Sequence, residues 1–194
     1  MNINGKTLLQ DAPIANMQTE KVKYLGTSHG LSEAGYDITI AQTVQFFPPN
    51  FDLFSQFIMS PDFKDLGPIS KRMVSEALYG FIKITDRHGK TTKTIGRFVL
   101  ASAVEYFQMP LHLVATVKDK SSWARKGLSV FNTVAEPGWN GYLTLELVFN
   151  GSEPVTIEAG QGIAQVLFTQ LSDLGDYGAG KYQNQENEPV QSRS

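Results

Sequence analysis

An alternating run in the second half of the chain constrains its fold more than any other feature. From Leu143 to Phe149 every second residue is leucine or phenylalanine, and this period of two is typical of a β-strand with one buried face. Asn-Gly dipeptides stand on either side of the run, at 140–141 and 150–151. Because this dipeptide favours tight hairpin turns, the run predicts a strand joined to its neighbours through hairpins.

Glu146 is the only charged residue in this run, and it falls on the face opposite the leucines. A carboxylate among apolar neighbours is costly to bury unless something compensates it, and a carboxylate held in such surroundings suits a general base. For an isolated strand, an outward glutamate in contact with water is the simpler interpretation. The residues upstream favour the catalytic interpretation.

Cations and hydroxyl groups gather shortly before this strand. Lys120, Ser121 and Ser122 are consecutive, and Arg125 and Lys126 follow closely. Lysine and arginine offer charge-assisted hydrogen bonds, whereas serine offers neutral ones. A single helical turn opening at Ser121 would also point free N–H groups at an anion. The stretch therefore predicts a site that holds phosphate oxygens.

Composition excludes several classes of function. The 194 residues fit one domain, and 17 Lys and Arg against 19 Asp and Glu give a formal net charge of −2. Since no global positive field exists, we expect no nucleic-acid partner. The chain has no cysteine, which excludes disulfides and cysteine-ligated zinc, and the three histidines show no metal-ligand spacing.

The sequence gives no sign of a membrane. Its amino terminus lacks the long apolar core of a secretory signal, and no apolar run approaches membrane-spanning length. We therefore expect a cytoplasmic protein with no membrane partner.

Many short strand patterns separated by Gly, Pro and Asn turns predict an all-β domain, partly barrel-like, with one or two short helices. One helix is expected over 69–78. An aromatic-rich excursion, at about 48–95, should pack against the barrel or against a neighbouring subunit. The domain is expected to span 1–172.

Residues 173–194 form a polar tail rich in Gly, Gln, Asn and Glu. By composition this tail is flexible, but its lysine, tyrosines and amides could order over a bound nucleotide as a lid. The predicted phosphate site at 120–126, the carboxylate of Glu146 and the tail are far apart in sequence, so the site could also form between subunits of a symmetric oligomer.

At this point the sequence resembles the dCTP deaminase family, within the trimeric dUTPase-like superfamily. The matching segments, in chain order, are Gly35–Ile40, Gly96–Ser102, Lys120–Leu128, Glu136–Trp139, Leu145–Leu147, Gly162–Gln165 and Lys181–Gln185. Several segments in the right order are more specific than one motif. The resemblance implies a dUTPase-like distorted β-barrel, or jelly-roll-like, fold.

The resemblance also implies an activity and its requirements. The reaction would be hydrolytic loss of the cytosine 4-amino group from dCTP, giving dUTP and ammonia. It would take place in a homotrimer with shared active sites, with magnesium bound through the triphosphate and no zinc. The lack of cysteine agrees independently, because zinc nucleobase deaminases need cysteine ligands. dTTP is a candidate inhibitor.

The roles of single residues follow from the same resemblance. Glu146 would take a proton from water and return it to the leaving amine, while Ser121 and Arg125 would place that water and stabilise charge on the ring. No protein ligand to a metal is implied. The residues expected to bind substrate are Lys120, Ser122, Glu136, Thr144, Leu145, Tyr177, Lys181, Tyr182 and Gln185.

The chain departs from the family pattern at three places. Asp119 replaces the usual glycine before the basic residue, and it would repel a triphosphate unless it turns away or meets magnesium. Glu136 replaces the usual aspartate before Pro-Gly. The segment 129–135 is shorter than usual and lacks the usual histidine, so the pocket that distinguishes cytosine from uracil is where this chain differs most.

Two other functions stay open at this stage. The first is a dUTP diphosphatase, or a bifunctional enzyme that deaminates dCTP and also cleaves the triphosphate, with Glu136 standing where the diphosphatase branch has its water-activating aspartate. The second is a non-catalytic trimeric protein that binds nucleotides or a partner through the aromatic excursion.

Overall fold

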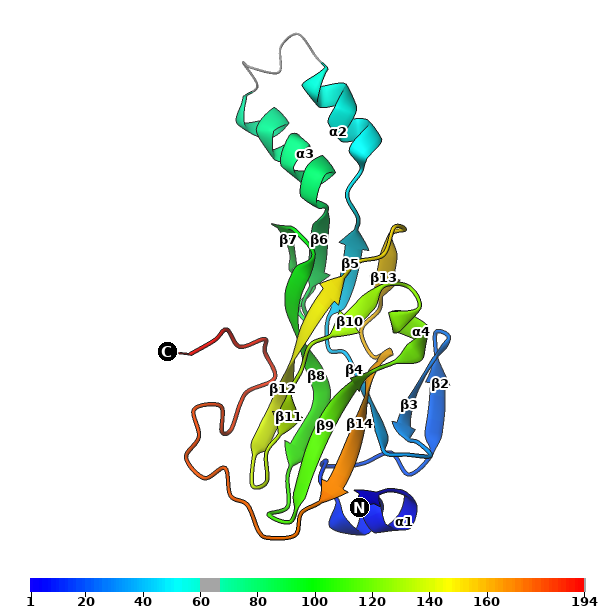
Figure 1. Cartoon of the computed structure of the whole chain (residues 1–194), viewed down its shortest axis with the longest axis vertical. Coiled ribbons are helices and arrows are strands. Elements are labelled where there is room, and N and C mark those ends of the chain that lie inside the picture. Colours follow the sequence, from blue (N-terminus) through cyan, green and yellow to red (C-terminus); the bar gives the residue numbers. More distant parts are fainter. Residues whose placement is uncertain (60–66, 194) are drawn as a thin grey trace.

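The structure, a computed structural model, describes residues 1–59 and 67–193 (Figure 1). Its strands are β1 (Asn2–Ile3), β2 (Lys21–Tyr24), β3 (Thr27–Leu31), β4 (Tyr36–Thr39), β5 (Thr43–Phe47), β6 (Phe81–Thr85), β7 (Thr91–Ile95), β8 (Phe98–Gln108), β9 (Leu113–Asp119), β10 (Leu128–Val130), β11 (Val134–Ala135), β12 (Asn140–Phe149), β13 (Val155–Ile157) and β14 (Gly162–Gln170). Its helices are α1 (Gly5–Asp11), α2 (Phe51–Ile58), α3 (Pro68–Tyr79) and α4 (Ser121–Ala124).

The strands form three antiparallel sheets within the described residues. The largest has the order β11-β9-β14-β4-β3-β2, with β1 also pairing with β14; the others are β10-β12-β8 and β13-β5-β6-β7. Side chains from all three meet in one core, where Ile38, Phe46 and Leu147 are at most 1% exposed. The prediction of an all-β domain is confirmed, although the sheets pack together without closing.

Strand β12 has the predicted two faces from Leu145 onward, whereas Leu143, beside a register shift between Tyr142 and Thr144, is only partly buried and lines the cavity described below. Leu145, Leu147 and Phe149 are buried in the core, while Glu146 on the other face is half-buried. The strand lies between β10 and β8 and pairs with both. The sequence pattern therefore placed Glu146 on the correct side of the sheet.

The predicted hairpins at the two Asn-Gly dipeptides are wrong. Residues 140–141 already belong to β12, and β13, which follows 150–151, pairs with β5 instead of β12. Gly141 is needed for a different reason, because a Cβ there would lie 2.7 Å from the backbone nitrogen of Gln185. The glycine lets another part of the chain approach the strand.

Helices α2 and α3 form a hairpin that projects from one end of the sheets, between β5 and β6 (Figure 1). The helix expected over 69–78 is observed as α3, but α2 was not expected, and the described residues contain four helices instead of one or two. Asn50 starts α2, because its side chain accepts from the N–H of Leu53 at 2.9 Å.

No side chain of α2 is buried in this single chain, so packing of the excursion against the barrel is not observed for this helix. The part of the excursion at 60–66, with Phe63, and the last residue of the tail lie outside the described residues. Among residues 1–59 and 67–193, no helix is long and apolar enough to cross a membrane.

After β14 the chain runs back beside β12 (Figure 1). The N–H of Tyr142 donates to the carbonyl of Gln185 at 2.9 Å, and the N–H of Asn184 donates to the carbonyl of Asn140 at 2.8 Å. The indole N–H of Trp139 donates to the carbonyl of Tyr182 at 2.8 Å. The described part of the tail is thus ordered against the start of β12.

Candidate active site

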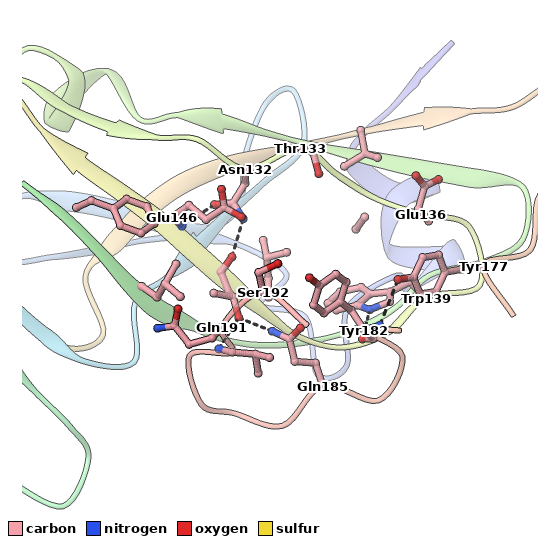
Figure 2. A pocket seen from close by; sticks show the side chains of 17 residues that line it. Asn132, Thr133, Glu136, Trp139, Glu146, Tyr177, Tyr182, Gln185, Gln191 and Ser192 are labelled. Atoms are coloured by element: carbon pink, nitrogen blue, oxygen red, sulfur yellow. Dashed lines mark hydrogen bonds between the residues drawn. The ribbon is translucent and has the colours of Figure 1, made fainter. Parts of the chain in front are cut away.

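A cavity of about 450 Å³ lies over the outer face of β12 (Figure 2). Strands β8 and β12 supply one wall, the segment before Pro137 supplies another, and the tail covers the third. The lining residues are Phe98, Leu100, Asn132, Thr133, Val134, Ala135, Glu136, Trp139, Leu143, Thr144, Glu146, Tyr177, Tyr182, Gln185, Val190, Gln191 and Ser192. Two carboxylates and several amides and hydroxyls therefore share one partly apolar space.

Glu146 is held in the cavity wall by its backbone. Its N–H donates to the side-chain oxygen of Asn132 at 3.2 Å, and its carbonyl accepts from the N–H of Phe131 at 2.9 Å. On the other side it is paired with Leu100 of β8. A carboxylate on a central strand, fixed on both edges, is well placed to act on a bound water.

Thr144 is the point where the tail fastens to β12. Its hydroxyl oxygen accepts from the side-chain amide of Gln185 and, at 3.1 Å, from the N–H of Val190. Gln185 is only 5% exposed, so this residue of the tail is packed against β12. The side chain of Leu145 is buried in the core, so only the backbone of that residue can meet a ligand.

The tail tyrosines are also fixed. The N–H of Tyr177 donates to the carbonyl of Pro137 at 2.7 Å, and the hydroxyl of Tyr177 accepts from the N–H of Tyr182 at 3.3 Å. The N–H of Arg193 donates to the Tyr182 hydroxyl at 3.3 Å and lowers the pKa of that phenol below its ordinary value. The Nζ of Lys181 donates to the carbonyl of Arg193 at 2.7 Å.

Lys181 does not line the cavity, and it holds the end of the tail instead. Arg193 was missed in the sequence, where it looks like an ordinary cation in a polar tail. Its guanidinium lies 5.8 Å from the ring centre of Tyr182, and the Nζ of Lys181 lies 5.2 Å from it. Two cations therefore flank a tyrosine of the cavity wall.

Lys120 is committed to a buried ion pair. Its Nζ lies 2.5 Å from Oδ2 of Asp37, and the two side chains are 12% and 3% exposed. Ser28 donates to the same oxygen at 3.0 Å. The sequence analysis did not identify Asp37 as a functional residue. The pattern that indicated Glu146 was present there too, because Asp37 is the only carboxylate in the alternating strand Tyr36–Ile40.

Ser121, Ser122 and Arg125 are not among the residues that line the cavity of their own chain. They belong to α4 and its end, where Ser121 and Arg125 are exposed. The predicted cap is also shifted, because the residue before the helix is Lys120 and its side chain caps nothing. Within the described residues the Oγ of Ser122 is buried and has no hydrogen-bond partner.

The extra carboxylate of Asp119 is turned toward β10. Its Oδ1 accepts from the N–H of Val130 at 2.7 Å, so the carboxylate caps the end of a strand. Glu136, in contrast, is exposed and lines the cavity. In the described part of the chain, no three His, Asp or Glu side chains are grouped so that they could hold a metal ion.

Comparison with known proteins gives one consistent match. The family model described as dCTP deaminase-like matches residues 8–171. The dCTP deaminase of Herpetosiphon aurantiacus is 34% identical over 171 residues, covering 81% of this chain and 78% of that protein. That of Chlamydia abortus is 33% identical over 163 residues, covering 82% and 76%.

Two solved structures are similar at lower identity. The dCTP deaminase from Agrobacterium tumefaciens has a TM-score of 0.49 and 12% identity, over 88% of this chain and 48% of that chain. The EIAV dUTPase has a TM-score of 0.45 and 14% identity, over 89% of this chain and 96% of that chain.

Proposed function

Because the chain belongs to the dCTP deaminase-like family, we propose that it hydrolyses dCTP to dUTP and ammonia. The observation that carries this proposal is the position of Glu146 in the wall of the cavity, on a strand whose sequence matches the family motif. The cavity is large enough for a pyrimidine ring and its sugar. We further propose that the enzyme acts in the cytoplasm.

Glu146 acts as the general base. It takes a proton from a water molecule whose oxygen bonds to C4 of the cytosine, and it returns the proton to the 4-amino nitrogen as the C4–N bond breaks, while the second proton of the water moves to N3 of the ring. One water is consumed and one ammonia leaves, so atoms balance without a redox step. The reaction needs no zinc, and the chain has no cysteine to hold the usual zinc set of nucleobase deaminases.

We propose a homotrimer in which Ser121 and Arg125 of one subunit complete the cavity of the next. This arrangement is supported by their exposure on α4 and by their position outside the cavity of their own chain. Across such an interface, the guanidinium would stabilise charge that develops on the ring. Ser122, with its unpartnered buried hydroxyl, would bind phosphate oxygens after a small rearrangement.

The triphosphate would be held by Lys120, Ser122 and Lys181, with magnesium bound to its oxygens. Magnesium prefers oxygen ligands and commonly binds between phosphates, and when bound it neutralises part of their charge. Asp119 fits this arrangement because its carboxylate faces the N–H of Val130. Tyr177, Lys181, Tyr182 and Gln185 close the tail over the nucleotide, and dTTP would compete for the same cavity.

A second activity has one observation in its favour. Glu136 is an exposed carboxylate in the cavity wall, where it could activate water against a phosphate. The alternative is therefore dUTP diphosphatase activity, alone or together with deamination. A trimer that binds nucleotide without turnover would leave Glu146 without a role.

The test is to incubate the purified protein and magnesium with dCTP and, separately, with dUTP, and to assay ammonia and pyrophosphate. We expect ammonia from dCTP, and its loss in Glu146→Gln, which keeps the shape and removes the base. Glu153→Gln, at an exposed glutamate outside the cavity, is the matched control. If pyrophosphate forms without ammonia, the diphosphatase replaces the proposed deaminase. If neither product forms, the non-catalytic nucleotide-binding protein is the remaining function.

A further inference from the structure

The side chain of Asn132 binds the backbone of β12 on both sides of Leu145. Its Nδ2 donates to the carbonyl of Thr144 at 2.6 Å, and its Oδ1 accepts from the N–H of Glu146 at 3.2 Å. The neighbouring Phe131 donates its N–H to the carbonyl of Glu146 at 2.9 Å. Figure 2 shows Asn132 directly beside Glu146 in the cavity. Both backbone groups of Glu146 are thus bound by two adjacent residues of one loop.

The side chain of Asn132 extends the hydrogen bonding between β10 and β12 beyond the last pair of backbone residues. The regular pairing of β10 with β12 ends at Val130, opposite Leu147. Beyond this point the primary amide imitates a peptide group, since it has one acceptor and a donor on the same planar unit. Without it, a carbonyl and an N–H beside the cavity would lose their partner, and an unsatisfied group of this kind costs about 1–3 kcal/mol when it is buried.

The loop is also anchored at its other end. Val134 and Ala135 pair with Thr116 and Ala115 of β9, so Thr133 alone lies between the two anchors. This is the segment that the sequence showed to be shortened and to lack a histidine. Because backbone pairing with β12 ends at Val130, the side chain of Asn132 shapes the cavity wall near Glu146 in this short loop.

We infer that Asn132 is a positioning residue, which fixes the backbone of Glu146 and the loop 131–135 so that the carboxylate meets the reacting ring. This inference rests on the proposed deamination. The amide of Asn132 donates one N–H to β12 and accepts one N–H from it, so its orientation is fixed by the strand.

The first test compares Asn132→Ala and Asn132→Asp with the wild type in steady-state deamination of dCTP. A displaced general base lowers turnover more than binding, so we expect kcat to fall by about ten- to a hundredfold while KM changes little. A rise in KM with unchanged kcat would assign Asn132 to substrate binding and overturn the inference. So would unchanged values of both constants.

The aspartate variant adds a signature that loss of packing cannot produce. Its ionised carboxylate accepts from Glu146 but repels the carbonyl of Thr144, whereas its protonated form can donate to that carbonyl. Its kcat relative to the wild type should therefore rise as pH falls, while the ratio for Asn132→Ala stays flat. Glu136 and Glu146 also face this cavity, and the new carboxylate acts on both of them. Asn132→Ala adds no charge, so it separates the loss of the two hydrogen bonds from the effect of the added carboxylate.

Asn16→Asp is the matched control, because Asn16 is exposed and lies outside the cavity. It should match the wild type at every pH, and a pH-dependent ratio in this control as well would contradict the assignment.

A readout independent of turnover separates this inference from the proposed function. In amide hydrogen exchange, the N–H of Glu146 should be protected in the wild type and exchange at least tenfold faster in Asn132→Ala. Protection that survives the substitution overturns the inference even if the enzyme deaminates dCTP. Lost protection in a protein that does not deaminate dCTP upholds the positioning of Glu146 and rejects the reaction.

Discussion

Lys120 and Asp37 form an ion pair in the interior, with 2.5 Å between Nζ and Oδ2. The pair joins the start of α4 to β4 and engages the lysine that the sequence predicts to bind phosphate. Removing two charges from water is costly, and only close pairing offsets this. In the free chain Lys120 therefore holds α4 in place, so the exposed groups of Ser121 and Arg125 are presented from a fixed helix.

Lys120→Met should destabilise the fold by about 3–5 kcal/mol, because it leaves the Asp37 carboxylate buried without a cation. The double variant Lys120→Met, Asp37→Leu should regain much of this loss. Chemical denaturation of the two single variants and the double variant measures the coupling. The exposed pair Lys21–Glu33 is the control, since Glu33→Gln should change stability little. A similar small effect at both pairs would contradict the interior role of Asp37.

Thr144→Val should release the end of the tail. The valine keeps the volume but removes the oxygen that accepts from Gln185 and Val190, and each lost hydrogen bond is worth about 1 kcal/mol. We expect faster proteolysis within 186–193 and a higher KM for nucleotide. Thr156→Val, on the exposed edge of β13, should leave both unchanged. A tail that is equally resistant in both variants would show that other contacts hold it.

Gly141→Ala should push the tail away from β12. A Cβ there would lie 2.7 Å from the nitrogen of Gln185, and the φ of +147° is one that side chains rarely adopt. Backbone strain of this kind costs about 1–3 kcal/mol, and it should appear as a lower midpoint of denaturation together with faster hydrogen exchange at Gln185. Gly89→Ala, where φ is also positive but the space is open, should lower stability without any change in the tail.

Strand β12 could be predicted from the sequence because its information is local. The alternation from Leu145 to Phe149 fixes which side chains enter the core, and therefore the side on which Glu146 lies. The helix α3 followed from its period in the same way. The helix α2 did not, because prolines and closely spaced aromatics hide its short apolar stripe, and the Asn50 cap becomes clear only once the helix is known.

Contacts across long separations could not be predicted from the chain. Asp37 meets Lys120 over 83 positions, and no local pattern links them. Asn132 was overlooked for another reason: a shortened loop reveals a missing residue more readily than it reveals the side chain that compensates for it. The tail was expected to close over the site. Its attachment to Thr144 and Gly141 could not be predicted, because it depends on the fold that brings residues 185–190 beside β12.

Glu105 is a half-buried carboxyl outside the cavity. Its two oxygens accept from the N–H of Thr39 at 3.0 Å, and one accepts from the Thr39 hydroxyl at 2.9 Å. Burial raises the pKa of Glu105 from 4.5 to about 7, and the hydrogen bonds from Thr39 offset only part of this effect. The folded chain therefore keeps a proton on Glu105 over a range of pH in which the unfolded chain has lost it.

Stability should consequently fall as pH rises between about 4.5 and about 7, since the folded state binds more protons than the unfolded state in this window. Above about 7 both states are ionised and this contribution stops changing. The total should be about 3.5 kcal/mol at most, at about 1.4 kcal/mol for each unit of pKa. In Glu105→Gln, which keeps the shape and cannot titrate, chemical denaturation from pH 4.5 to 8 should show this slope removed. If the slope persists in Glu105→Gln, another carboxyl is responsible, and Glu105 is ionised in the fold at neutral pH.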